Sequence, residues 1–126
     1  MQFFTFITIG LGGAIGAITR VAMAKVLPEY VSAVPAYILC INIIGCFLMG
    51  LLAEIMSLHW PLSENMRYFL ISGFLGGFTT FSAFALEFGL LFQKNQHFLA
   101  LLYAALSFIF SIGAFFVGSK IVRVFS

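Results

Sequence analysis

The sequence predicts an all-α membrane protein with four transmembrane helices. Of its 126 residues, 63% are hydrophobic and only 8% are charged, whereas an ordinary soluble domain has about 45–50% apolar and about 25% charged residues. Each helical crossing takes about 20 apolar residues, so four crossings use most of the chain and leave only short connections. We therefore expect residues 1–126 to form a single four-helix transmembrane domain.

Four apolar runs and the breakers between them place the spans. Pro28-Glu29 ends the first run, and His59-Trp60-Pro61 ends the second. Ser63 precedes the third run as a helix cap, and the polar stretch 93–96 separates the third run from the fourth. Because the runs do not alternate apolar and polar residues as β-barrel strands do, we expect helices. The predicted spans are 3–27, 34–58, 66–92 and 98–122.

The distribution of the charges excludes one class of partner and predicts two orientations. The net charge of +2 comes from isolated Lys and Arg residues, which form neither a nucleic-acid patch nor a polybasic lipid-binding segment. Lys and Arg asymmetry sets the orientation of a membrane protein. A balanced chain should therefore insert both ways up and pair as an antiparallel dual-topology homodimer. The side with the termini collects three cations and the opposite side three: Arg67, Lys120 and Arg123 against Arg20, Lys25 and Lys94.

Glycine and threonine interrupt the third apolar run near mid-membrane. Gly73, Gly76 and Gly77 precede the stretch 78–84, which contains two threonines. Glycine costs about 1 kcal/mol relative to Ala in a helix interior, so we expect the third helix to be broken here. Two interpretations stay open: an ion site built from freed carbonyl groups in buried irregular backbone, or close helix packing through glycine.

The first run combines a small-residue face with a charge. Gly12 and Gly16 have GxxxG spacing, which helix packing explains. Arg20 lies near the end of the span, where a charged side chain either reaches the membrane surface or faces water or a partner. One hypothesis pairs Arg20 with Glu87 within one subunit.

Polar side chains on the second and fourth runs supply hydrogen-bond donors. Asn42 is a lone amide among apolar residues, and it serves either as a hydrogen-bonded link between helices or as a donor to an anion. Tyr103, Ser107 and Ser111 recur every four residues and form one hydroxyl stripe on a helix. Amide and hydroxyl donors without a fixed positive charge suit an anion that must both enter and leave.

Two of the seventeen phenylalanines have a position that suggests a site. Phe81 and Phe84 are three residues apart and follow the glycine and threonine stretch. Ring edges are the positive part of the aromatic quadrupole, so these rings can face an anion as weak donors. Cys40 and Cys46, six apart, are expected to be small core residues that do not bridge each other.

Three segments resemble the CrcB or Fluc family of fluoride channels, and the resemblance covers essentially the whole chain. The family implies a passive, fluoride-selective channel that exports fluoride from the cytoplasm across the bacterial inner membrane, with two pores per antiparallel homodimer. It is not an enzyme family. The segments are Gly-Gly-Ala-Ile-Gly-Ala-Ile-Thr-Arg at 12–20, Asn-Ile-Ile-Gly-Cys-Phe-Leu-Met-Gly at 42–50 and Gly-Gly-Phe-Thr-Thr-Phe-Ser-Ala-Phe at 76–84.

The resemblance also implies roles for individual residues. Phe81 and Phe84 would line the pore beside Asn42, and Tyr103, Ser107 and Ser111 would continue the pore track. Arg20 would make the pore entrance electropositive. Backbone carbonyls of Gly76 and Thr79 from both subunits would hold a structural sodium ion at the two-fold axis, and oxygen is the ligand that hard cations prefer.

The chain departs from the family pattern at two positions, and two other classes of membrane protein compete with the channel interpretation. The family usually has Thr where this chain has Ile38 and Ala83, so two hydroxyl groups near the pore are lost. A small multidrug-type proton-coupled exporter needs an acidic residue in the first span, and the run 3–27 has none. A membrane scaffold subunit would explain the glycines but not the polar stripe with its phenylalanine pair.

Overall fold

Four long apolar helices make up the computed structural model, which describes residues 2–27, 36–58 and 63–125. The third span is assembled from four consecutive helical segments, and each of the four spans is long and apolar enough to cross a membrane. The prediction of an all-helical, four-span protein is therefore confirmed. In chain order the elements are α1 (Gln2–Val26), α2 (Ala36–Leu58), α3 (Glu64–Arg67), η1 (Tyr68–Leu75), α4 (Gly76–Phe78), α5 (Phe81–Gln93) and α6 (His97–Val124).

The connections bear out one predicted helix start and leave others outside the described residues. Ser63 caps α3, since its hydroxyl accepts a hydrogen bond of 3.2 Å from the amide of Met66. Between α5 and α6, Asn95 has a φ of 62°, a left-handed conformation that Asn tolerates better than most residues. The breakers at 28–29 and 59–61, and the predicted start of the second span at 34, lie outside the described residues.

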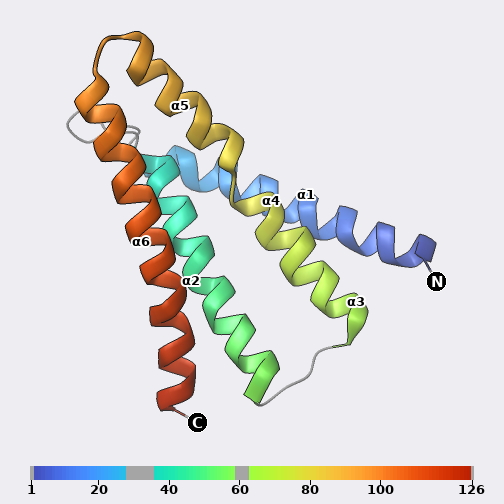
Figure 1. Ribbon diagram of the computed structural model, residues 1–126. Coiled ribbons are helices and arrows are strands. Elements are labelled where there is room, and N and C mark those ends of the chain that lie inside the picture. The colour runs from blue at the N-terminus through green and yellow to red at the C-terminus, as the bar shows by residue number, and fades with distance from the viewer. Residues whose placement is uncertain (1, 28–35, 59–62, 126) are drawn as a thin grey trace.

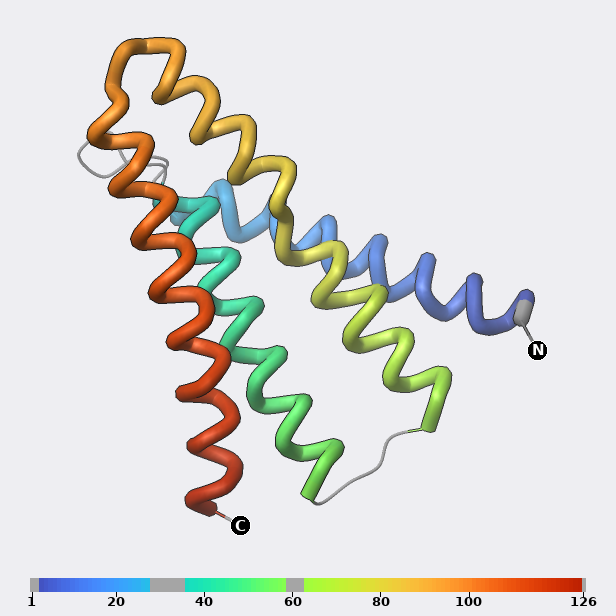
Figure 2. Tube along the Cα trace, viewed as in Figure 1, coloured from blue at the N-terminus to red at the C-terminus, as the bar shows by residue number. Residues whose placement is uncertain are grey.

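The helices pack as two pairs joined at the kinked third span. α2 lies along α6, and α1 crosses η1 and α4, as Figures 1 and 2 show. α5 packs against the beginning of α6 (Figure 1). The third span, which forms one pair with α1, therefore also contacts the pair of α2 and α6. Fully buried side chains mark the junction: Ile41, Leu75, Phe78 and Tyr103.

Glycine sets the close approach of α1 to the third span. A Cβ atom at Gly12 would overlap the carbonyl oxygen of Phe69, and one at Gly16 would overlap the carbonyl oxygen of Phe74. The predicted packing role of this glycine pair is confirmed. Only hydrogen fits at these two positions, so the backbones touch directly.

Glycine also allows α2 and α6 to approach each other closely. A Cβ at Gly50 would overlap the carbonyl oxygen of Phe115, and a Cβ at Gly118 would overlap that of Phe47. Next to this contact, the buried hydroxyl of Ser119 donates to the Gly50 carbonyl oxygen at 3.3 Å. Both helix pairs therefore rest on backbone-to-backbone contact.

Residues Tyr68–Leu75 form a π-helix, which the sequence did not predict. Glycine propensity and apolar periodicity indicate a helix here, but they do not distinguish α from π hydrogen bonding. The π-segment packs against α1 along its length, and α4 continues from it for three residues.

The helical backbone of the third span stops after Phe78 and restarts at Phe81. Thr79 (φ −86°, ψ 153°) and Thr80 (φ −152°, ψ 119°) are extended. The hydroxyl of Thr80 accepts a hydrogen bond of 3.2 Å from the Ala83 amide and so caps α5. Figure 2 shows the path stepping sideways between the two helical segments.

Substituting Gly16 by Ala should destabilise the protein through backbone overlap with Phe74. We expect Gly16→Ala to lower the free energy of unfolding by about 1–3 kcal/mol, the usual cost of overpacking. Unfolding in detergent, followed by far-ultraviolet circular dichroism, measures this value. Gly10→Ala is the matched control, because nothing lies within 4 Å of a Cβ at Gly10. Equal losses in the two variants would contradict the packing assignment.

Candidate functional site

A cavity of about 310 Å³ lies where α2, the Thr79–Thr80 break and α6 meet. Five residues predicted for a pore line it together, although they come from three different spans. The cavity is also bordered by Cys46, Thr79 and Thr80. The five are Asn42, Phe81, Phe84, Ser107 and Ser111.

Asn42 holds the extended backbone of the break. Its side-chain oxygen Oδ1 accepts a hydrogen bond of 3.0 Å from the Thr80 amide, and its Nδ2 donates to the Thr80 carbonyl oxygen at 3.3 Å. The amide thus links α2 to the third span, as the helix-to-helix interpretation expects. Nδ2 carries two hydrogens and this clamp uses one of them, so Asn42 also retains a donor at the cavity.

The two phenylalanines differ in how firmly they are held. Phe84 packs against Phe81 at a ring-centroid distance of 5.4 Å and against Tyr103 at 5.0 Å. Phe81, the first residue of α5, remains 79% exposed. The pair therefore has one anchored ring and one ring that projects from the subunit beside the cavity.

Only two of the three residues of the hydroxyl stripe on α6 line the cavity. Ser107 and Ser111 line the cavity, whereas Tyr103 is fully buried among apolar side chains behind Phe84. Within the described part of the chain, the hydroxyls of Tyr103 and Ser107 are buried with no hydrogen-bond partner. Buried polar atoms are nearly always hydrogen-bonded, so the Ser107 hydroxyl is a donor left for a ligand or water at the cavity, whereas Tyr103 does not line the cavity.

The break also frees two backbone carbonyls. In a continuous helix the Gly76 oxygen would accept from the Thr80 amide, and the Thr79 oxygen from the Ala83 amide. Both amides donate to side chains instead, to Asn42 Oδ1 and to Thr80 Oγ1. The two carbonyls expected to hold sodium have therefore lost their helical donors.

The glycines before the break divide between the two interpretations left open by the sequence. A Cβ at Gly73 or Gly77 would meet the backbone of α1 within 3 Å, so these two serve helix packing. Gly76 is exposed, and its nearest neighbour for a Cβ is the Ile71 oxygen at 3.6 Å. Packing accounts for two of the three, and Gly76 alone remains for a carbonyl site.

Comparison with known proteins gives one family over almost the whole chain. Residues 7–119 match the family described as CrcB-like protein, Camphor Resistance (CrcB). The chain belongs to the CrcB family. The match includes the first span from residue 7 onward, with Arg20, as well as the break and the residues that line the cavity.

Curated members of the CrcB family resemble the chain over most of their length, and each is named Fluoride-specific ion channel FluC. The relative from Rhizobium johnstonii is 38% identical, covering 93% of this chain and 94% of its own. The one from Rhizobium etli is 39% identical over 91% and 93%, and the one from Prosthecochloris aestuarii is 32% identical over 99% and 98%. Ion channels are not enzymes, so the family places this chain outside the enzymes.

Arg20 binds the break rather than Glu87. Its Nε donates to the Gly77 carbonyl oxygen at 3.1 Å, in the last turn of α4, where carbonyls lack helical donors. Glu87, only 7% exposed, accepts a hydrogen bond of 3.2 Å from the Tyr37 hydroxyl. The hypothesis of an Arg20–Glu87 ion pair within one subunit is therefore wrong for this CrcB chain.

Both departures from the CrcB pattern lie in one apolar cluster. Ile38, 3% exposed, packs in the cluster that contains Tyr103, and Ala83 packs against the same cluster. At these two positions, where the resemblance leads us to expect Thr, the chain thus has apolar side chains in one cluster. Neither Ile38 nor Ala83 is among the residues that line the cavity.

Sequence reasoning missed two contributors to the cavity. Cys46 was expected to be a core residue, but it lines the cavity together with Ser111; neither cysteine forms a disulfide. Thr80 supplies the backbone groups that Asn42 binds and the hydroxyl that caps α5. The signal for Cys46 was its spacing of four residues from Asn42, which puts both on one helix face.

Two alanine substitutions at the cavity should differ in their effect on stability. Asn42→Ala removes two hydrogen bonds to Thr80 and should lower the free energy of unfolding by about 1–3 kcal/mol. Ser107→Ala removes a hydroxyl without a partner and should leave stability unchanged or raised. Chemical unfolding in detergent measures both, and an equal loss in the two variants would disprove the role of Asn42 as a clamp.

Proposed function

We propose that this chain forms a passive, fluoride-selective ion channel that exports fluoride from the bacterial cytoplasm through the inner membrane. The observation that carries the proposal is the cavity beside the break, which Ser107 lines together with Phe81 and Phe84, and the buried Ser107 hydroxyl has no hydrogen-bond partner among the described residues. The FluC names of the curated relatives point to the same ion.

The donors at the cavity suit a small anion in transit. Moving a bare ion into a low-dielectric medium costs tens of kcal/mol, and one hydrogen bond to a charged group returns about 1.5–3 kcal/mol. Fluoride therefore stays partly hydrated and sheds water only along the narrow stretch beside Phe81 and Phe84. There it passes between the spare Asn42 hydrogen, the serine hydroxyls and the positive ring edges. Among the described residues that line the cavity, none carries a fixed positive charge that would trap the ion.

Two antiparallel subunits would complete the pores. Phe81 is 79% exposed in one subunit, which leaves the ring to face a second copy. The three-against-three balance of cations predicts insertion in both orientations. With both orientations present, the two-fold axis lies in the membrane plane, and each pore takes side chains from both subunits.

A sodium ion at the axis fits the freed carbonyls. Gly76 and Thr79 would hold it with the oxygens whose helical donors are diverted to side chains. Carbonyl oxygens are established ligands for alkali cations within membranes. The ion would neutralise these backbone dipoles where water is excluded and join the two subunits.

Phenylalanine substitutions should slow fluoride flux without abolishing folding. A contact with a ring quadrupole contributes about 0.5–1.5 kcal/mol, so Phe81→Ile and Phe84→Ile should each lower flux roughly three- to ten-fold. Asn42→Asp should block flux, because it adds a negative charge beside the path. Liposomes loaded with potassium fluoride, valinomycin and a fluoride electrode measure the rates.

The matched control is Phe98→Ile, a 77% exposed phenylalanine at the start of α6 that does not line the cavity. Chloride-loaded liposomes test selectivity. Wild-type flux in all three cavity variants would remove the pore assignment. Flux that needs a proton gradient would indicate an exporter, and no flux from folded protein would indicate a scaffold.

Removing sodium should weaken the dimer. A ligand bound only by the dimer stabilises it by about 2.7 kcal/mol at a hundred-fold excess over its dissociation constant. Replacing sodium by N-methyl-D-glucamine should therefore shift the dimer dissociation curve to a roughly hundred-fold higher protein concentration. Chromatography in detergent over a dilution series gives the curve. A dissociation curve that is independent of sodium would overturn the carbonyl site.

A further inference from the structure

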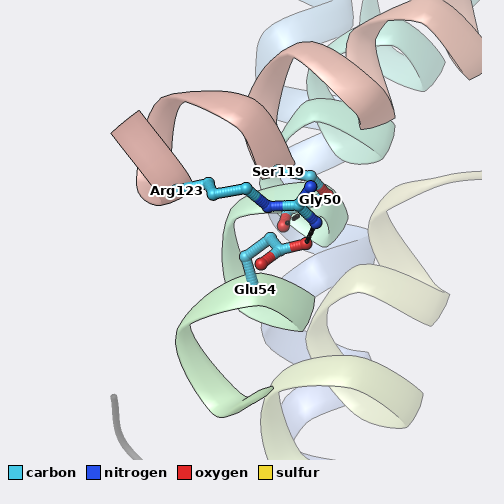
Figure 3. A network of polar contacts seen from close by, with 4 residues as sticks. All are labelled: Gly50, Glu54, Ser119 and Arg123. Carbon is cyan, nitrogen blue, oxygen red and sulfur yellow. Dashed lines mark hydrogen bonds and ion pairs between the residues drawn. The ribbon is translucent and has the colours of Figure 1, made fainter. Parts of the chain in front are cut away.

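A second cavity, of about 480 Å³, lies between α2 and α6 toward the C-terminal ends of both helices. It shares no lining residue with the cavity at the break. Figure 3 shows Arg123 reaching from α6 to Glu54 on α2, with Ser119 and Gly50 beside them. The polar groups here take no part in the proposed conduction path.

The cavity carries a surplus of positive charge among its lining residues. Arg123 Nη2 lies 2.8 Å from Glu54 Oε1, and the Arg123 side chain is 71% exposed while that of Glu54 is only 15% exposed. Lys120, also exposed, lines the same cavity one helical turn before Arg123. Among the described residues that line the cavity, two carry a positive and one a negative charge, and the mostly buried Glu54 carboxylate holds the Arg123 guanidinium.

The depth of the cavity and its walls match the headgroup region of a bilayer. α2 ends at Leu58 and α6 at Val124, so Glu54 and Lys120 lie one turn inside the ends of two membrane spans. Phe115 and Phe116 supply apolar wall, and Phe116 is 64% exposed. Basic pockets between transmembrane helices at this depth bind anionic lipid headgroups.

We propose that this cavity binds the phosphate group of an anionic phospholipid. Lys120 and Arg123 contact the phosphate, and Glu54 holds the guanidinium in place, which reduces the side-chain entropy lost on binding. The apolar wall at Phe116 accommodates the glycerol and the beginning of an acyl chain. The free phosphate ion shares the charge chemistry but makes no use of that wall.

Native mass spectrometry of the intact protein in neutral detergent tests the site. The probe is phosphatidylglycerol, with phosphatidylcholine as the neutral comparison. Each cation near an anionic lipid changes affinity by about five-fold, so Lys120→Gln with Arg123→Gln should lower the affinity for phosphatidylglycerol by about 25-fold. The matched control, Arg67→Gln with Lys94→Gln, removes the same charge away from the cavity and should stay within two-fold of wild type.

Two further measurements keep the test decisive. If the double variant does not purify as a folded protein, Lys120→Gln alone should still lower affinity about five-fold, because Lys120 lies outside the Arg123–Glu54 pair. Inorganic phosphate in millimolar excess should fail to displace the lipid. Equal retention of the two lipids, equal losses in cavity and control variants, or displacement by inorganic phosphate would each overturn the headgroup site.

Discussion

The need to satisfy backbone polar groups away from water governs the centre of this molecule. In a bilayer an unpaired amide or carbonyl costs several kcal/mol, yet the third span contains two extended residues, Thr79 and Thr80. The chain meets this need with side chains from other spans. Asn42 binds both backbone groups of Thr80, and Arg20 binds the carbonyl of Gly77.

These bonds have a cooperative consequence for the fold. Because Asn42 belongs to α2 and Arg20 to α1, the break is stable only when both helices are in place. The glycine contacts of α1 with the third span bring Arg20 within reach of Gly77. The stability of the helix packing and that of the extended backbone at the break therefore depend on each other, and neither comes from a single helix.

The sequence predicted the four spans because length and hydropathy suffice to identify them. It predicted five of the residues that line the cavity, two of them because residue spacing fixes which side chains share a helix face. Ser107 and Ser111 illustrate the second point. Tyr103 shows the limit: spacing put it on the stripe, but the packing of α6 against residues of α2 and α5 buried it behind Phe84. The partner of Arg20 depends on how α1 crosses α4, a tertiary property that no local pattern encodes, and so the ion pair with Glu87 was wrong.

The π-helix of Tyr68–Leu75 gives the third span a reserve of length. A π-segment amounts to extra backbone accommodated within an α-helix, so residues before and after it do not share one helical phase. Loss of a single residue there can be absorbed by a return to α-helical hydrogen bonding, with the two ends of the span still anchored. The three residues of α4 have no such slack, since they lie between the π-segment and the extended threonines. We therefore expect a one-residue deletion to be tolerated better in the π-segment than in α4.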